Sequence, residues 1–344
     1  MAKHQAYTFP QLCSTCEDCV PEQAQASPCI VGTSSYYTTN AAHQLDAKVW
    51  EQHMATWTRR SVPGWRGSAI SFRALEASTR RPGVVVLHGG MKSSQDMMAL
   101  ARELASDFDV YVVDRRGRGP SAAHEAGFSV DAEVEDIGAV IVATGARFAF
   151  GLSSGALVTL RTTARSTPTL QRIALYEPPF DIEGSVPLKF VGQFEAELAQ
   201  GKRAKALITA LKGMQVEPLF TWLPRIVLEP ILSLIMRLQS EGDADDVPIR
   251  ALVPTLRYDF QIIDEMRDSL QDYTALQCKV LLLGGTKSPA FLRAALDALQ
   301  AALPNVERVT LDGLRHDGPE DDGSPKLVAV QLRRFFGAQS VVLS

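Results

Sequence analysis

The sequence lacks an excess of positive charge. Its 35 Lys and Arg residues are outnumbered by 39 Asp and Glu, which gives a formal net charge of -4 with histidine neutral. The two signs are interspersed, so no basic field for nucleic acid and no polybasic membrane anchor is present. We expect a small-molecule substrate and neither nucleic acid nor an integral membrane as a partner.

An uninterrupted apolar run of membrane-spanning length is also missing. The longest apolar stretch, 218–238, contains Pro224, Arg225, Glu229 and Pro230, whereas a spanning helix needs about 20 predominantly apolar residues. This stretch predicts an apolar lid or an interface instead. The first residues lack the apolar core of a signal peptide, so we expect a cytoplasmic protein with reduced thiols.

No internal repeat is found, and the chain divides by composition. Residues 1–35 are rich in Cys, Gln, Ser and Pro without periodicity and predict an extension. From about residue 68, short β-branched runs alternate with amphipathic segments, which is typical of a mostly parallel sheet flanked by helices, an α/β fold. The expected strands are 84–88, 109–114, 148–153, 172–177, 279–285 and 307–313, and the expected helices are about 95–106, 129–143, 154–165, 288–302 and 325–336.

The alternation breaks once, between the fourth and fifth expected strands. Residues 181–278 contain helix-like segments and no convincing strand. We therefore predict a core formed by 36–180 and 279–344, with 181–278 inserted as a helical cap. Ligands of open α/β sheets bind beyond the carboxyl ends of the strands, where such a cap would cover them.

A candidate nucleophile lies in the sequence GLSSG at 151–155. It fits G-x-S-x-G between an expected strand and an expected helix, and the spacing selects Ser153. Gly151 and Gly155 are needed because this tight turn leaves no room for Cβ atoms at either position. A plain Gly/Ser turn is the alternative.

A candidate oxyanion hole follows from the sequence LHGGM at 87–91. The N–H groups of Met91 and Ser154 would donate to the developing negative charge, and each such donor is worth about 3 kcal/mol. A simple Gly-Gly turn is the alternative, and we interpret His88 as structural.

The serine needs a base, because a neutral hydroxyl is a poor nucleophile. Of the six histidines, His316 follows the last expected strand, in a loop that could bring the imidazole to Ser153. His124 lies in a polar loop, and the remaining histidines precede the core or belong to the oxyanion loop. The order Ser then His favours His316 as the base.

At this point the chain resembles the α/β-hydrolase superfamily over roughly residues 65–338. The motifs that carry the resemblance, in family order, are HGG (88–90), DRRGRGPS (114–121), GLSSG (151–155), LYEPP (175–179), LLLGGTKSP (281–289) and LDGLRHD (311–317). The resemblance implies an eight-stranded type of sheet, a Ser/acid/His triad and hydrolysis of an ester, thioester or amide.

The position of the acid departs from the common family pattern. Where the family usually has an aspartate after the VLLLGG strand, this chain has Ser288, which cannot carry the charge. Some members take the acid from the strand after the nucleophile helix, which would select Glu177. Asp259 is the alternative acid, and Asp317, next to the histidine, is the third.

The sequence DRRGRGPS places Asp114, Arg115 and Arg116 at the sheet edge. We interpret them as a structural charge network, with binding of a substrate carboxylate by one arginine as the alternative.

Four cysteines near the N-terminus have the pattern C-x2-C-x2-C-x9-C, at Cys13, Cys16, Cys19 and Cys29. They could ligate zinc or an iron–sulfur cluster, but the spacing matches no standard finger. We therefore interpret them as thiols and expect no metal and no cofactor. Cys278, before a core strand, is expected to pack in the core.

The expected cap has many large apolar side chains, among them Met214, Phe220 and Trp222. They would line an apolar acyl or ring pocket or form a homodimer contact, and packing against the sheet is the alternative. The sequence thus predicts a serine hydrolase that cleaves a carboxylic ester, lactone or thioester of a medium-sized apolar acid through an acyl-enzyme. A cyclase, lyase or ligand-binding protein on the same fold is the alternative.

Overall fold

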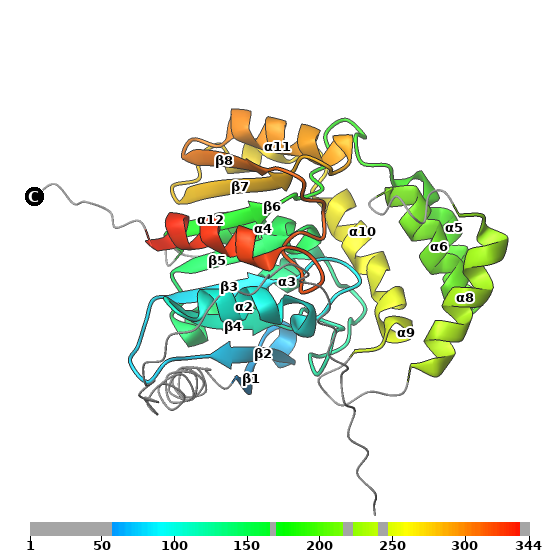
Figure 1. Cartoon of the computed structure of the whole chain (residues 1–344), viewed down its shortest axis with the longest axis horizontal. Coiled ribbons are helices and arrows are strands. Elements are labelled where there is room, and N and C mark those ends of the chain that lie inside the picture. Colours follow the sequence, from blue (N-terminus) through cyan, green and yellow to red (C-terminus); the bar gives the residue numbers. More distant parts are fainter. Residues whose placement is uncertain (1–56, 166–169, 216–222, 240–246, 338–344) are drawn as a thin grey trace, which may run out of the picture. The chain divides into compact units, whose positions relative to one another are not determined.

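The computed structural model describes residues 57–165, 170–215, 223–239 and 247–337, all within the unit Met54–Ser344. These residues form a mostly parallel sheet with helices on both faces and a helical segment inserted between two strands (Figure 1). The predicted fold class is confirmed. The residues expected to form the N-terminal extension, including Cys13, Cys16, Cys19 and Cys29, lie outside the described residues.

The sheet has eight strands in the order β1-β2-β4-β3-β5-β6-β7-β8. They are β1 Thr58–Pro63, β2 Ala69–Leu75, β3 Gly83–Leu87, β4 Asp109–Val113, β5 Phe148–Leu152, β6 Arg172–Tyr176, β7 Lys279–Gly285 and β8 Val306–Leu311. β2 pairs antiparallel with both β1 and β4, and the strands from β4 through β3, β5, β6 and β7 to β8 are parallel to one another. β3 to β6 are buried along their whole length, which explains their continuous apolar runs.

The helices cover the two faces of the sheet in separate sets. α2 Met98–Leu104 and α12 Pro325–Gly337 pack on one face, with side chains such as Leu100 and Leu332 in the same core cluster as Phe150. α3 Val130–Thr144, α4 Ser154–Arg165 and α11 Ala290–Ala302 contribute to the core on the other face. β3 to β6 are therefore shielded on both sides, and all the parallel strands direct their carboxyl ends toward one edge.

The described residues between β6 and β7 form helices and no strand. They comprise η3 Leu188–Phe190, α5 Val191–Ala199, α6 Arg203–Met214, α8 Arg225–Leu238, α9 Ile249–Leu252, η4 Val253–Thr255, α10 Leu256–Glu265 and η5 Leu270–Tyr273. We treat this segment as the cap. α5, α6 and α8 lie together at one end of the molecule in Figure 1, with α10 between them and the sheet.

The strand register aligns the loops that carry the motifs. Leu87 pairs with Gly151 across β3 and β5, and Leu152 pairs with Tyr176 across β5 and β6. The residues that follow these pairs are therefore neighbours at the carboxyl edge. They include Ser153 and Glu177, which lie 24 positions apart in the sequence.

Candidate active site

Ser153 occupies a strained turn between β5 and α4. Its φ is +56°, in the left-handed region that non-glycine residues rarely adopt. A Cβ added to Gly151 would lie 2.5 Å from the Gly155 carbonyl oxygen, and one added to Gly155 would lie 2.4 Å from the His88 carbonyl oxygen. The expected crowding at both glycines is present, and the half-buried serine projects from the turn.

Glu177 and His316 form a hydrogen bond at the same edge. Glu177 Oε2 lies 2.8 Å from His316 Nδ1, and Glu177 Oε1 accepts a hydrogen bond of 2.6 Å from the Gly285 N–H. The Glu177 side chain is 1% exposed and that of His316 is 16% exposed. The carboxylate is thus enclosed, while the imidazole remains accessible from the solvent side.

The loop that carries His316 is fixed to the same strand as the glutamate. The Tyr176 hydroxyl donates a hydrogen bond of 2.7 Å to the Arg315 carbonyl oxygen. Because Glu177 follows Tyr176 directly, one strand end orients both the loop backbone and the ring. With Nδ1 bonded to the carboxylate, Nε2 is the ring nitrogen left for proton transfer.

The loop after β3 runs against the nucleophile turn. A Cβ added to Gly89 would lie 3.0 Å from the Ser153 Cβ, so glycine gives the closest approach of the two segments without crowding. Met91 in this loop has a φ of +61°. In the described part of the chain, the Met91 and Ser154 N–H groups have no hydrogen-bond acceptor, and the Ser153 hydroxyl has no partner.

A second ion pair, Lys92 with Glu320, connects the loop after β3 with the loop that carries His316. The Lys92 Nζ lies 2.6 Å from Glu320 Oε2. Two further bonds join the same segments, from the Asp321 N–H to the Asp96 carbonyl oxygen at 2.9 Å and from the Ala99 N–H to Asp321 Oδ1 at 2.8 Å. This connection was not predicted from the sequence. The lysine directly after HGGM and the acidic run after the histidine could have indicated it.

The surroundings of His316 favour its protonated form. Burial opposes protonation, but the hydrogen bond and charge of Glu177, together with the charges of Glu320 and Asp317, raise the pKa of His316 above its ordinary value. Burial raises the pKa of Glu320 to about 7, against the opposing charges of Lys92 and His316. His316 and Glu320 therefore both titrate with raised pKa values.

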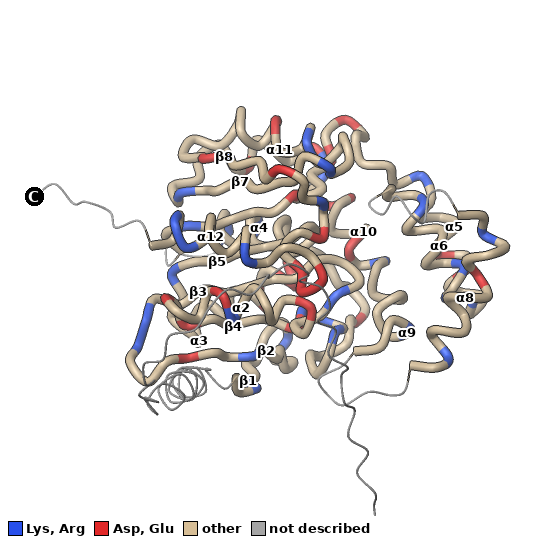
Figure 2. The backbone as a smooth tube through the Cα atoms, viewed as in Figure 1, with Lys and Arg blue, Asp and Glu red and all other residues tan. Residues whose placement is uncertain are grey.

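Asp259, the alternative acid, lies in a different buried cluster. Its Oδ1 lies 3.0 Å from Arg115 Nη1 and accepts a hydrogen bond of 2.8 Å from the Ser154 hydroxyl, and its Oδ2 pairs with Arg118. Arg115 also pairs with Glu133 at 2.8 Å. Figure 2 shows acidic and basic residues gathered at the sheet edge that faces α10. Asp259 thereby joins the cap to the nucleophile helix and has no hydrogen bond to His316.

The neighbouring charges of the expected network are also paired. Arg116 Nη2 lies 2.7 Å from Asp136 Oδ1. Asp114 accepts hydrogen bonds of 2.9 Å from the Ser94 N–H and from Arg59. These contacts hold the loop after β4 in place, and each named side chain has a partner within the protein.

Two further histidines, the buried His88 and the half-buried His124, have partners other than Glu177. His88 Nε2 accepts a hydrogen bond of 3.2 Å from the Arg115 N–H, and burial lowers the pKa of His88 well below its ordinary value. His124 stacks on Tyr258 with the ring centroids 3.5 Å apart, and burial beside the arginines lowers its pKa to about 2. Both imidazoles stay neutral.

The remaining expected residues have varied positions. Met214 is half-buried against the core, and Phe220 and Trp222 lie outside the described residues. Ser288 is buried, and its hydroxyl has no partner in the described part of the chain. Cys278 is half-buried at the start of β7.

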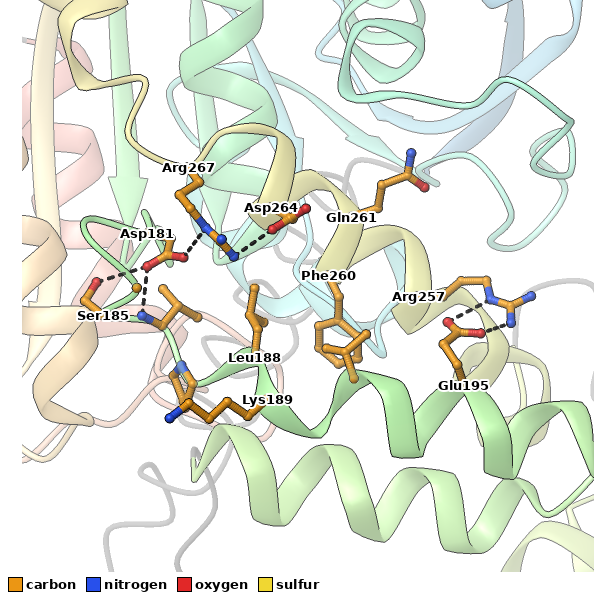
Figure 3. A pocket seen from close by; sticks show the side chains of 14 residues that line it. Asp181, Ser185, Leu188, Lys189, Glu195, Arg257, Phe260, Gln261, Asp264 and Arg267 are labelled. Atoms are coloured by element: carbon orange, nitrogen blue, oxygen red, sulfur yellow. Dashed lines mark hydrogen bonds and ion pairs between the residues drawn. The ribbon is translucent and has the colours of Figure 1, made fainter.

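A hollow of about 960 Å³ lies between the start of the cap and α10 (Figure 3). Phe260 and Leu188 point into it, and the ion pairs Arg267–Asp181 and Arg257–Glu195 lie at its two ends. Ser153, Glu177 and His316 do not line it. We therefore assign the candidate chemistry to the strand edge and regard the hollow as a groove of the cap.

The described residues contain neither a membrane-spanning helix nor a metal-binding cluster. No described helix combines the length and the apolar character needed to cross a membrane. No group of three or more His, Cys, Asp or Glu within the described ranges is arranged to hold a metal ion.

Comparisons with known proteins place this geometry in a family. The model of the alpha/beta hydrolase family matches residues 84–331. An N-formylmaleamate deformylase from Pseudomonas putida is 39% identical over 83 residues, which cover 23% of this chain and 31% of the deformylase. The chain thus matches less than a third of that relative's length.

Solved structures are similar over most of the described chain. An alpha/beta hydrolase from Sphaerobacter thermophilus is 28% identical with a TM-score of 0.64, covering 80% of this chain and 100% of that one. An N-formylmaleamic acid deformylase from Pseudomonas putida S16 is 18% identical with a TM-score of 0.57 at the same coverage. With its elbow, its parallel sheet and a family match over residues 84–331, the chain belongs to the alpha/beta hydrolase family.

Proposed function

We propose that the protein is a serine hydrolase that forms an acyl-enzyme on Ser153. The observation that carries the proposal is the 2.8 Å hydrogen bond between His316 Nδ1 and Glu177 Oε2, at the edge where Ser153 occupies its strained turn. This bond fixes the tautomer that leaves Nε2 as the base. The accessible imidazole and the half-buried serine fit a reaction in which the histidine loop adjusts when substrate binds.

The first half-reaction transfers the acyl group to the serine. Ser153 Oγ forms a bond to the substrate carbonyl carbon as its proton passes to His316 Nε2. The Met91 and Ser154 N–H groups, which have no acceptor in the described part of the chain, donate to the resulting oxyanion. The bond to the leaving group then breaks, and the leaving group takes the proton from His316.

The second half-reaction releases the acid. Water gives its proton to His316 Nε2 and adds to the acyl carbon, and the tetrahedral intermediate returns Ser153 Oγ with that proton. The Glu177 carboxylate stabilises the imidazolium in both halves. The raised pKa of His316 supports this role because it reflects a favoured imidazolium.

We assign the acid role to Glu177 and not to Asp259. Asp259 is occupied by Arg115, Arg118 and the Ser154 hydroxyl. It acts in this proposal as a positioning residue, because it holds the cap helix α10 against the start of α4.

For the substrate we propose a carboxylic ester, lactone or thioester of a medium-sized apolar acid. The half-buried Met214 of the cap supports an apolar acyl group. The similarity to a deformylase gives a specific reason to add a formamide to the candidates, since an acyl-enzyme also accommodates an amide.

The test is labelling by a fluorophosphonate, which reacts with an activated serine. We expect labelling of the wild type and none of Ser153→Ala. Ser154→Ala is the matched control, because it removes the neighbouring hydroxyl and keeps the Ser154 N–H. A panel of p-nitrophenyl esters, lactones, acyl thioesters and N-formyl amides would then identify the acyl group. An unlabelled protein that turns over substrate would contradict the covalent proposal and favour non-covalent chemistry.

A further inference from the structure

The outer surface of cap helix α8, Arg225–Leu238, is apolar. Its inward positions Leu228, Leu232 and Met236 are buried in the core. Its outward positions are also aliphatic, with exposed fractions from 40% to 82%. They are Ile226, Val227, Ile231, Leu234, Ile235 and Leu238. We call these six residues the α8 face.

Exposed apolar clusters of this kind on a protein surface mark sites of interaction with another surface. Fully burying one Leu or Ile side chain stabilises by about 1.5–3 kcal/mol, so leaving six exposed is a considerable cost. Elsewhere in the described chain the exposed large apolar residues are few, namely Val142, Leu327 and Val330. The α8 face is therefore the exposed apolar cluster that needs an explanation.

Basic residues surround a small hollow beside the α8 face. The hollow has a volume of about 290 Å³ and lies where α6 meets α8. Its charged lining consists of Lys202, Arg203, Lys205, Arg237, Arg250 and one acid, Glu229. Lys202, Arg203 and Lys205 are neighbours in the sequence, and the fold adds Arg237 and Arg250 from later segments.

The charged groups leave positive charge available at this hollow. Glu229 lies 3.6 Å from Lys205 in an exposed pair, which offsets one cation. Arg203 and Arg237 have no ion pair in the described part of the chain. At the other end of α8, Arg225 forms an ion pair with Glu197 at 3.6 Å. A lipid bilayer with anionic headgroups is complementary to this surface, because its acyl chains suit the aliphatic side chains and its headgroups suit the cations.

We infer that the α8 face docks on a lipid bilayer surface with anionic headgroups. The six aliphatic side chains enter the boundary between headgroups and acyl chains, and the basic hollow accepts a lipid phosphate. A second copy of the chain fits less well. In a two-fold antiparallel contact of α8 helices, Arg225 of one copy would face Arg237 of the other, and like charges repel. This inference goes beyond the proposed hydrolase activity and does not depend on it.

Co-sedimentation with vesicles tests this inference without measuring hydrolysis. We expect the wild type to bind vesicles of phosphatidylcholine and phosphatidylglycerol in equal parts more strongly than pure phosphatidylcholine, with binding that falls as salt rises. The double variant Ile226→Asn, Leu234→Asn should lose about 100-fold or more in partition. The double variant Arg203→Gln, Arg237→Gln should lose roughly 30-fold on the anionic vesicles.

The matched control is Val142→Asn, Leu327→Asn. Those residues are 74% and 52% exposed on the hydrolase core, against 82% and 55% for Ile226 and Leu234. The control should bind vesicles like the wild type. Equal losses in both apolar variants, or no binding of the wild type to anionic vesicles, would overturn the inference. Light scattering that finds a dimer, which Ile226→Asn, Leu234→Asn converts to a monomer without vesicle binding, would assign the face to a second copy instead.

Discussion

Glu177→Gln is the substitution that examines the proposed triad most closely. The carboxylate accepts two hydrogen bonds, from the Gly285 N–H at 2.6 Å and from His316 Nδ1 at 2.8 Å. A glutamine has one acceptor oxygen and one NH₂ group in the same space. If the oxygen remains on Gly285, the NH₂ group faces His316 and demands the tautomer with its proton on Nε2. The opposite orientation points two donors at each other.

The tautomer of His316 determines how far kcat should fall in Glu177→Gln. An imidazole with its proton on Nε2 cannot accept the proton of Ser153. In a serine protease triad, the equivalent acid-to-amide change lowers kcat by about 10⁴. At about 1.36 kcal/mol for each factor of ten, this corresponds to about 5.4 kcal/mol in the barrier. We expect a loss of this size for Glu177→Gln, with little change in substrate affinity.

The assay is steady-state hydrolysis of a p-nitrophenyl ester, with Asp259→Asn as the comparator. Asp259 has no hydrogen bond to His316, so kcat should change by less than about tenfold. Its loss leaves Glu133 as the one buried acid in the described part of the chain that faces both Arg115 and Arg118, so the free energy of unfolding should fall by about 3–5 kcal/mol. Urea denaturation measures the loss in free energy of unfolding separately from the change in kcat.

A reversed ranking would refute the reasoning. If folded Asp259→Asn loses more activity than folded Glu177→Gln, the acid role belongs to Asp259. If Glu177→Gln stays within about tenfold of the wild type, the hydrogen bond to His316 does not set the tautomer.

Three further predictions concern pH and the turn. Because His316 must be neutral to act as a base, its raised pKa predicts that kcat/KM increases with pH with a midpoint above 6.5. In Glu177→Gln the midpoint for the residual activity should shift to lower pH, and an unshifted midpoint would contradict this. Burial raises the pKa of Glu320 to about 7, and the ionised carboxylate holds Lys92 by an ion pair. Glu320→Gln removes this titrating group, so the slope of log kcat/KM on the acid side of the pH profile should fall to that of one proton. An unchanged slope would exclude this role. Gly155→Ala would bring a Cβ within 2.4 Å of a carbonyl oxygen and should destabilise by about 1–3 kcal/mol in urea unfolding, whereas Gly192→Ala, with open space around it, should not; equal effects would contradict the crowding argument.

The sequence predicted the structure best where burial restricts a position to one kind of residue. β3 to β6 are shielded on both faces, so their apolar runs predicted their bounds to within a residue. The glycines of the elbow were predictable because the turn excludes Cβ atoms. The sequence also proposed Glu177 beside His316, because both follow strands that end at the same edge.

Other features depend on tertiary contacts that no local pattern encodes. β1 is an exposed edge strand of sequence TRRSVP, which has no apolar run to mark it. The Lys92–Glu320 pair joins positions 228 residues apart in the sequence, and Asp259 meets Arg115 only after the cap folds back. The outward side of α8 could not be separated from its inward side, because both are aliphatic.

Mass spectrometry of the protein quenched during turnover of p-nitrophenyl acetate tests the central claim most directly. The account predicts one acetyl group per chain, carried by the peptide that contains Ser153, and none in Ser153→Ala. Turnover without an acetylated serine, or with the acetyl group on another residue, would contradict it.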